Sequence, residues 1–163
     1  SGVVLDFEKT PNLNIKARVT DEGGLFYDKV FVIGLNNVNE APTDIKLSNE
    51  YLADNAVGGS VLGVLTGVDP DARPYLTYSL IDSAGGKFIV NSKTGVISLN
   101  KMAVIDPLIT PTINITARVT DQGGLTYDKD FAIKTGHIIF GASGNDILTS
   151  TAASDIYLSL IHI

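Results

Sequence analysis

The chain of 163 residues contains no cysteine and no tryptophan, and its apolar residues form no long uninterrupted run. Without cysteine there can be neither disulfides nor thiolate metal sites, so an oxygen-ligated metal remains as a way to stabilise the chain. A bilayer-spanning helix needs roughly 18 consecutive apolar residues, and no segment has them. The two histidines, His137 and His162, lie far apart, which argues against a zinc site.

The charge balance is acidic, with a formal net charge of −6. A surface of this sign is repelled by a phosphate backbone, so nucleic acid is not expected as a partner. No nucleophile motif or Ser-His-Asp grouping is present, and nothing indicates a substrate cleft beside the pair Asp69 and Asp71, which could otherwise act as a glycosidase acid and base. The sequence therefore predicts a protein that is not an enzyme.

Two segments a hundred residues apart are nearly the same. Residues 14–33 read NIKARVTDEGGLFYDKVFVI and residues 114–133 read NITARVTDQGGLTYDKDFAI, with 15 of the 20 positions identical. A repeat of about one hundred residues is the size of a β-sandwich domain, so the chain is interpreted as part of a tandem array.

Short β-rich runs bounded by Gly, Asn and Ser dominate the second repeat, and no segment has a helical period. The pattern predicts an all-β, seven-strand antiparallel Greek-key sandwich. Its expected strands are residues 43–48, 60–66, 76–80, 87–90, 96–99, 113–120 and 126–134.

The organisation expected along the chain has four parts. Residues 1–35 are the C-terminal fragment of a preceding repeat, residues 36–42 are a short link ending in proline, and residues 43–135 are a complete repeat. Residues 136–163 follow a different pattern. There Gly141, Gly144, Asp146 and Leu148 fit the calcium-binding turn G-G-x-G-x-D-x-U-x, and the closing YLSLIHI is interpreted as a non-native tail.

Acidic and amide side chains recur at defined places in the repeat. They are Asp6 and Glu8, the link residues Asn37, Asn39 and Glu40, the pair Asp54-Asn55, the pair Asp69 and Asp71, and Asp121. Calcium takes 6–8 oxygen ligands, and loops of a sandwich cluster at its two poles, so side chains dispersed in sequence can converge on one ion. The alternative interpretation is that each Asp caps its own turn.

The order of these motifs resembles the cadherin repeat in its bacterial form, over residues 3–135. The matching elements are Asp54-Asn55 followed by glycine, Asp-x-Asp at Asp69 and Asp71, the strand at residues 94–99, Leu-Asp-x-Glu at residues 5–8, and Asp121 in Asp-x-Gly. The link Asn-x-Asn-Glu-x-Pro at residues 37–42 completes the pattern.

The resemblance implies calcium (Ca2+) at the junction between consecutive repeats. The implied ligands are Asp6, Glu8, Asn37, Asn39, Glu40, Asp69, Asp71 and Asp121. Asp21 would serve the junction above, and Asp54 and Asp106 the junction below. That lower junction departs from the pattern, because Leu108 stands where the copy has Glu8. Asp146 would belong to the separate calcium-binding turn.

The function implied is that of a calcium-stiffened structural or adhesive module of a large bacterial surface or secreted protein, exported by a type I route. Its partners would be neighbouring repeats of the same chain and surface glycans or proteins. Homophilic adhesion by strand exchange is disfavoured, because that mode docks a tryptophan and the chain has none. The alternative is a sandwich that binds glycan or protein, possibly appended to a secreted hydrolase.

Overall fold

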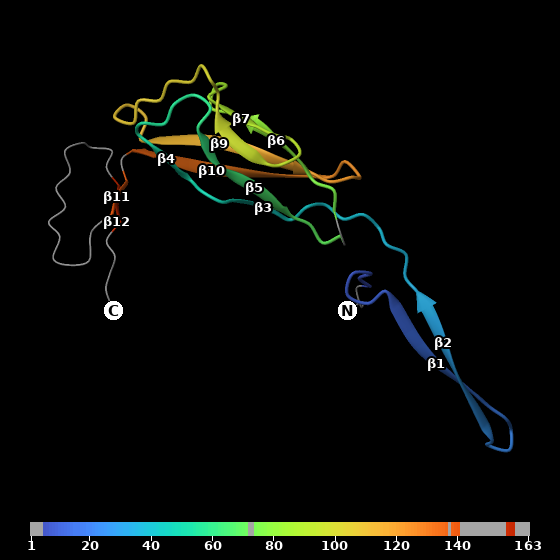
Figure 1. The fold of residues 1–163 in the computed structure, drawn as a ribbon. Helices are drawn as coiled ribbons and strands as arrows, with labels where there is room; N and C mark the ends of the chain where they lie inside the picture. The colour runs from blue at the N-terminus through green and yellow to red at the C-terminus, as the bar shows by residue number, and fades with distance from the viewer. Residues whose placement is uncertain (1–4, 72–73, 137, 141–155, 159–163) are drawn as a thin grey trace. The chain divides into compact units, whose positions relative to one another are not determined.

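The computed structural model describes residues 5–71, 74–136, 138–140 and 156–158 (Figure 1). All regular elements in these ranges are β-strands, so this part of the chain holds no helix that could cross a membrane. The all-β class is confirmed. The chain divides into two compact units, residues 1–40 with 70–73 and residues 41–69 with 74–163, and each is described by itself.

The first unit is built around an antiparallel hairpin of β1 (Asn12–Thr20) and β2 (Phe26–Gly34), in which Thr20 lies opposite Phe26. The turn between them is closed by Asp21, whose backbone N–H donates to the carbonyl of Leu25 and whose carboxylate accepts from the Leu25 N–H at 2.9 Å. Gly24 has a φ of 85°, a conformation that glycine adopts without steric cost. The Asp-x-Gly-Gly sequence therefore supplies the geometry of the hairpin locally.

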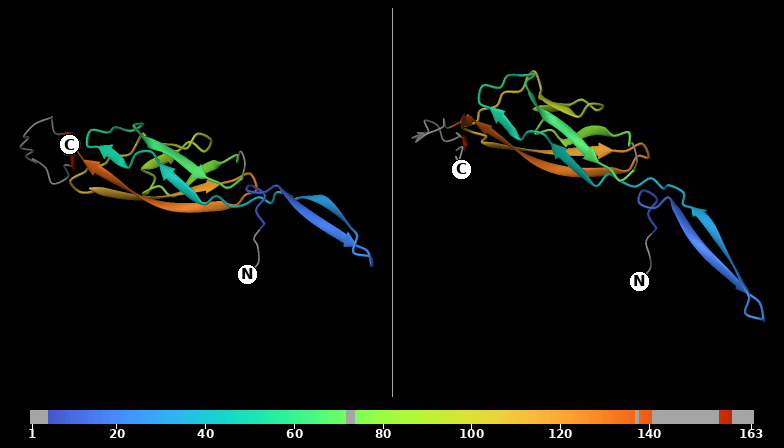
Figure 2. Two further views of the ribbon diagram at one scale, coloured as in Figure 1. Left: turned by 90° about the horizontal axis from the view of Figure 1, so that it is seen from below. Right: turned by 60° about the horizontal axis from the view of Figure 1, so that its bottom comes forward.

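The second unit is a sandwich of two four-stranded sheets (Figure 2). One sheet has the order β4-β10-β9-β6 and the other the order β3-β5-β8-β7. The strands are β3 (Asp44–Leu47), β4 (Tyr51–Ala53), β5 (Val61–Val68), β6 (Thr77–Asp82), β7 (Phe88–Val90), β8 (Val96–Leu99), β9 (Thr112–Thr120) and β10 (Thr126–Gly136).

The core of this unit lies between the two sheets. Alternate residues of β9 point inward, which is why the sequence there alternates apolar and polar side chains. Both sheets contribute to one buried cluster, whose members are Ile45, Leu52, Leu62, Leu65, Phe88, Ile97, Leu99, Ile113, Ile115, Ala117, Val119, Phe131 and Ile133. The sandwich predicted from the strand pattern is therefore present.

The sequence analysis missed one strand. β4 is three residues long and pairs in parallel with the end of β10, at Tyr51 opposite Lys134. Asn49 makes the transition from β3 to β4, because its side-chain amide donates to the carbonyls of Tyr51 and Leu62 at 2.8 Å. A run this short, next to Asn and Glu, carries no strand pattern, although it brings the beginning of the unit onto the opposite sheet.

Two further strands, β11 (Ile138–Phe140) and β12 (Ile156–Leu158), pair in parallel with each other. The predicted calcium-binding turn, with Gly141, Gly144, Asp146 and Leu148, lies between them and outside the described residues. It stays a prediction.

Candidate metal centre

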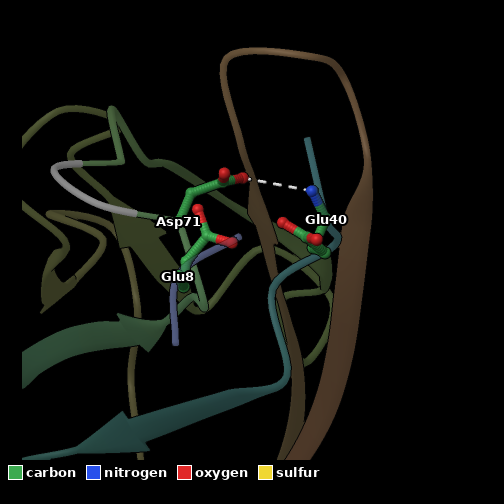
Figure 3. Close-up of side chains that lie close together, drawn as sticks. All are labelled: Glu8, Glu40 and Asp71. Atoms are coloured by element: carbon green, nitrogen blue, oxygen red, sulfur yellow. Dashed lines mark hydrogen bonds between the residues drawn. The ribbon is translucent and has the colours of Figure 1, made fainter. Parts of the chain in front are cut away.

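Three carboxylates from separate segments of the first unit come together (Figure 3). Glu8 lies in the turn before β1, Glu40 in the link after β2, and Asp71 in the segment 70–73. One carboxylate oxygen of each lies within 4.8 Å of one oxygen of the others. The segments are 32 and 31 residues apart in sequence, so the meeting depends on the fold rather than on a local turn.

Asp71 is the fixed member of the group. Its side chain is buried, and both of its oxygens accept hydrogen bonds: Oδ1 from the side-chain amide of Asn37 and Oδ2 from the backbone N–H of Glu40, each at 3.1 Å. The second of these bonds is the dashed line in Figure 3. The link is therefore held against Asp71 at two points, and this brings the side chain of Glu40 towards the other carboxylates.

Glu8 is positioned by a compact turn. The backbone N–H of Thr10 donates to the carbonyl of Asp6 at 2.9 Å, and the Asp6 carboxylate accepts from the backbone N–H of Lys9 at 3.0 Å. Lys9 also forms a salt bridge to Asp6 at 2.8 Å. These hydrogen bonds and this salt bridge keep the pKa of Asp6 below its ordinary value. Asp6 is thus neutralised by Lys9 in the same turn that carries Glu8.

The electrostatics of the group are unfavourable as long as only carboxylates meet there. Desolvation by the neighbouring groups raises the pKa of Glu40, and the negative charges of Glu8, Asp71 and Asp6 raise it further. The Oε1 atom of Glu8 is buried and has no hydrogen-bond partner among the described residues. Crowded like charges and an unsatisfied oxygen are both features that a bound cation would relieve.

The spacing of the oxygens fits a hard divalent cation. Calcium binds oxygen at about 2.3–2.6 Å, so two ligands on opposite sides of one ion lie about 5 Å apart. One carboxylate oxygen each of Glu8, Glu40 and Asp71 lies within 4.8 Å of the other two, which is close enough for all three to bind one ion. Three carboxylates, with the amide oxygens of the link nearby in sequence, make a donor set of the kind that calcium prefers, and the residues present therefore fit the ion.

The structure brings together part of the predicted ligand set. Glu8, Glu40 and Asp71 form the cluster, Asn37 is hydrogen-bonded to it, and the Asn39 side-chain amide donates to the Glu40 carbonyl at 3.3 Å. Asp69 and Asp121 belong to the second unit. Asp121 is buried, and its carboxylate accepts from the Leu125 N–H at 2.8 Å, the same turn bond that Asp21 makes in the first repeat.

The candidates predicted for the other sites lie in turns. Asp106 accepts from the Leu108 N–H at 3.0 Å, and Asp54 lies in the exposed turn after β4. Neither is part of the cluster formed by the described residues. Asp146 lies outside the described residues. The sequence analysis missed the role of Lys9, although an Asp followed three residues later by Lys is a recognisable turn-level ion pair.

Comparisons of the sequence with known proteins find relatives among the protocadherins. No family model matches the chain. Human Protocadherin Fat 1 is 30% identical over 123 residues, which are 73% of this chain and 3% of that protein. Protocadherin Fat 2 of Rattus norvegicus is 31% identical over 124 residues, or 74% of this chain and 3% of that protein. The chain thus spans only a small part of the length of these relatives.

Solved structures show the same fold. Drosophila N-cadherin EC1-4 matches with a TM-score of 0.63 at 18% identity, covering 81% of this chain and 36% of that chain. Mouse cadherin-23 EC22-24 matches with a TM-score of 0.56 at 23% identity, covering 82% of this chain and 45% of that chain. The sequence relatives and the structural neighbours together support a cadherin-like domain in this chain.

Proposed function

We propose that this chain is a calcium-binding structural and adhesive module of a large bacterial surface or secreted protein, stiffened by calcium at the junction of its repeats. The observation that carries the proposal is the cluster of Glu8, Glu40 and Asp71. Its members come from the end of one repeat, the link, and the beginning of the next. A cation bound there would connect all three segments.

The mechanism is electrostatic. Without metal, the carboxylates repel one another, and the negative charges of Glu8, Asp71 and Asp6 add to the desolvation that raises the pKa of Glu40. With metal, each carboxylate is attracted to the same cation, and the link loses its freedom to move. An ion that binds only the folded state stabilises it by about 2.7 kcal/mol when present at 100 times its dissociation constant. The resemblance extends the proposed ligand set to Asp6, Asn37, Asn39, Asp69 and Asp121.

The extracellular setting is supported by the relatives. Structural neighbours include the extracellular cadherin domains of protocadherin gamma B7 and the ectodomain of human desmocollin-1. The proposed bacterial source rests on the form of the repeat motifs, and the proposed type I export rests on the adjacency of the cadherin-like repeat and the calcium-turn motif near Asp146.

The test is calcium binding by the full chain, measured by isothermal titration calorimetry and by thermal unfolding with and without EDTA. Calcium should raise the unfolding midpoint of the wild type. Asp71→Ala should lose most of this shift, because it removes the anchored ligand. Glu8→Gln should weaken binding while breaking no hydrogen bond, since Oε1 has no partner among the described residues.

The matched control is Asp130→Asn, which removes one exposed carboxylate from β10. Its carboxylate accepts a hydrogen bond from the Thr116 hydroxyl at 2.7 Å, and it is not part of the cluster. This variant should keep the full calcium response. A wild-type chain with neither a binding heat nor a change in midpoint would exclude the proposal.

A further inference from the structure

The two carboxylate oxygens of Asp6 have different kinds of partner. Oδ1 accepts a hydrogen bond from the backbone N–H of Lys9 at 3.0 Å, and Oδ2 accepts one from the ammonium of the same residue at 2.8 Å. The first bond closes the turn that precedes β1, and the second is an ion pair between two side chains. Oδ1 therefore serves the backbone of the turn, whereas Oδ2 is held by a side chain.

The turn can form without the ammonium. In the second repeat, Asp106 stands where the first has Asp6, and Ile109 stands where it has Lys9. In both repeats the backbone N–H four residues after the aspartate donates to the aspartate carbonyl, at 2.9 Å in the first and 2.8 Å in the second. The same backbone bond thus forms with an apolar side chain in place of the lysine, so building the turn does not explain the ion pair.

Lys9 shares a cavity with carboxylates of the candidate metal centre. The cavity has a volume of about 400 Å³ and is lined by Asp6, Glu8, Lys9, Glu40 and Pro70, all of which belong to the first unit. The negative charge of Asp6 is also one of those that raise the pKa of Glu40. Asp6 and its ion pair are therefore electrostatically part of the site, although Asp6 is not one of the three clustered carboxylates.

The ammonium can leave Asp6 at little cost. The side chain of Lys9 is 82% exposed and that of Asp6 is 35% exposed. An exposed ion pair is weak, because water solvates both partners nearly as well as they bind each other. The lysine stem is flexible, so its ammonium can move into solvent while the backbone stays in place. Oδ2 of Asp6 can thus change from one cation to another without loss of the turn.

We propose that Lys9 is a tethered cation that competes with calcium for Oδ2 of Asp6, and so raises the calcium concentration at which the site fills. This inference rests on the proposed function. In the calcium-free chain the ammonium neutralises one carboxylate of the site. When calcium binds, the ammonium moves into solvent and Oδ2 becomes available. A divalent ion attracts Asp6 more strongly than a single ammonium does, because its charge is twice as large.

The alternative is that the ion pair supports the structure, and the two roles differ in the sign of one measurement. Lys9→Met keeps the stem and removes the charge. If Lys9 competes with calcium, the calcium dissociation constant should fall by roughly twofold to fivefold, as expected for an exposed pair. If Lys9 supports the turn that carries Glu8, the constant should rise. Isothermal titration calorimetry of the full chain with calcium measures it, and circular dichroism checks the folding.

The matched control is Lys16→Met, which removes the same charge from the same unit. Lys16 forms a salt bridge to Asp28 at 2.8 Å, and neither residue lines the cavity or belongs to the cluster. This variant should bind calcium as the wild type does. A double-mutant cycle with Asp6→Asn, which keeps an oxygen for the Lys9 N–H, separates competition for Asp6 from general charge repulsion. With Asp6→Asn present, Lys9→Met should have little effect, and an undiminished effect would contradict the proposal.

The displacement can also be observed at the lysine. The methylene group next to each ammonium gives its own NMR signal, and the Lys9 signal should move as calcium is added whereas the Lys16 signal should not. Equal or weaker calcium binding by Lys9→Met, or an unmoved Lys9 signal with calcium bound, would overturn this inference and leave the proposed function standing. A lack of calcium binding by both the wild type and Lys9→Met would overturn both.

Discussion

The two hairpins of this chain have nearly the same sequence and very different surroundings. Val19 is 66% exposed and Phe31 is 47% exposed, whereas their counterparts Val119 and Phe131 are 0% and 5% exposed. In the second repeat the sheet β3-β5-β8-β7 covers this face, and among the described residues no such sheet covers it in the first. The comparison separates what a segment encodes by itself from what its neighbours add.

The local features are the same in both copies. Arg18 and Arg118 each bind an aspartate of the facing strand through two nitrogens, with a shortest distance of 2.7 Å in each case. Gly24 and Gly124 have φ values of 85° and 86°. The hairpin is therefore encoded by its turn and its cross-strand pairs, whereas the burial of its apolar face is not.

The largest expected contrast is in the core. Phe131→Ala removes a buried ring and should lower the free energy of unfolding of the sandwich by about 3–5 kcal/mol. Phe31→Ala, at the corresponding exposed position, should leave that transition unchanged. Chemical denaturation followed by circular dichroism measures both. Equal losses for the two variants would mean that the first hairpin is packed in solution as the second one is.

The next contrast tests the turns, where the two copies should respond alike. A Cβ at Gly24 or Gly124 meets no atom within 4 Å, so alanine would cost only the left-handed conformation, about 1–2 kcal/mol. Gly124→Ala should therefore destabilise the sandwich by this amount. Gly24→Ala should speed amide exchange in β1 and β2 about tenfold, and an unaffected exchange rate would show that this turn does not support the hairpin.

The smallest contrast is electrostatic. Lys129 binds Asp44 at 2.7 Å in the sandwich, which lowers the pKa of Asp44, whereas the ammonium of the corresponding Lys29 lies 5.1 Å from the Phe31 ring centroid. A lowered carboxyl pKa adds stability at neutral pH that is lost as the pH falls through the folded-state value. Lys129→Met should therefore reduce stability slightly at pH 7, and this difference should vanish in strong acid.

Lys29→Met is the control for that measurement and should change the stability of the sandwich at neither pH. Unfolding free energies from urea titrations across the acid range give both differences. A loss at pH 7 that persisted unchanged in strong acid would show that Lys129 acts through its aliphatic stem rather than through its charge.

Most of the fold follows from the sequence pattern. Strict alternation over β9 and the Gly-Gly turn before β10 locate the hairpin, because side-chain direction in a strand has a period of two. β4 could not be found in this way, because three residues are too few to show a period. It is a strand only because it pairs with β10, where Tyr51 lies opposite Lys134, 83 residues away in sequence. Pairing of this kind is a property of the assembled sheets.

The site was predicted in part for a similar reason. The composition of the cluster, Glu8, Glu40 and Asp71, follows from the repeat motifs. The sequence does not show that Asp6 is paired with Lys9, or that the amide of Asn37 donates to Asp71. These details depend on which rotamer each side chain adopts once the turns are formed. Hydrogen bonds among the candidate ligands therefore decide which oxygens are left for an ion.

The position of β9 and β10 at the centre of their sheet has a consequence for the order of folding. These two strands come last in the cadherin-like domain, yet β4 and β6 both add to their edges. The sheet therefore cannot assemble before the chain has been synthesised as far as Gly136. A hairpin such as β1–β2 can form in about 1–10 μs, whereas a sandwich held by pairings distant in sequence typically needs milliseconds to seconds.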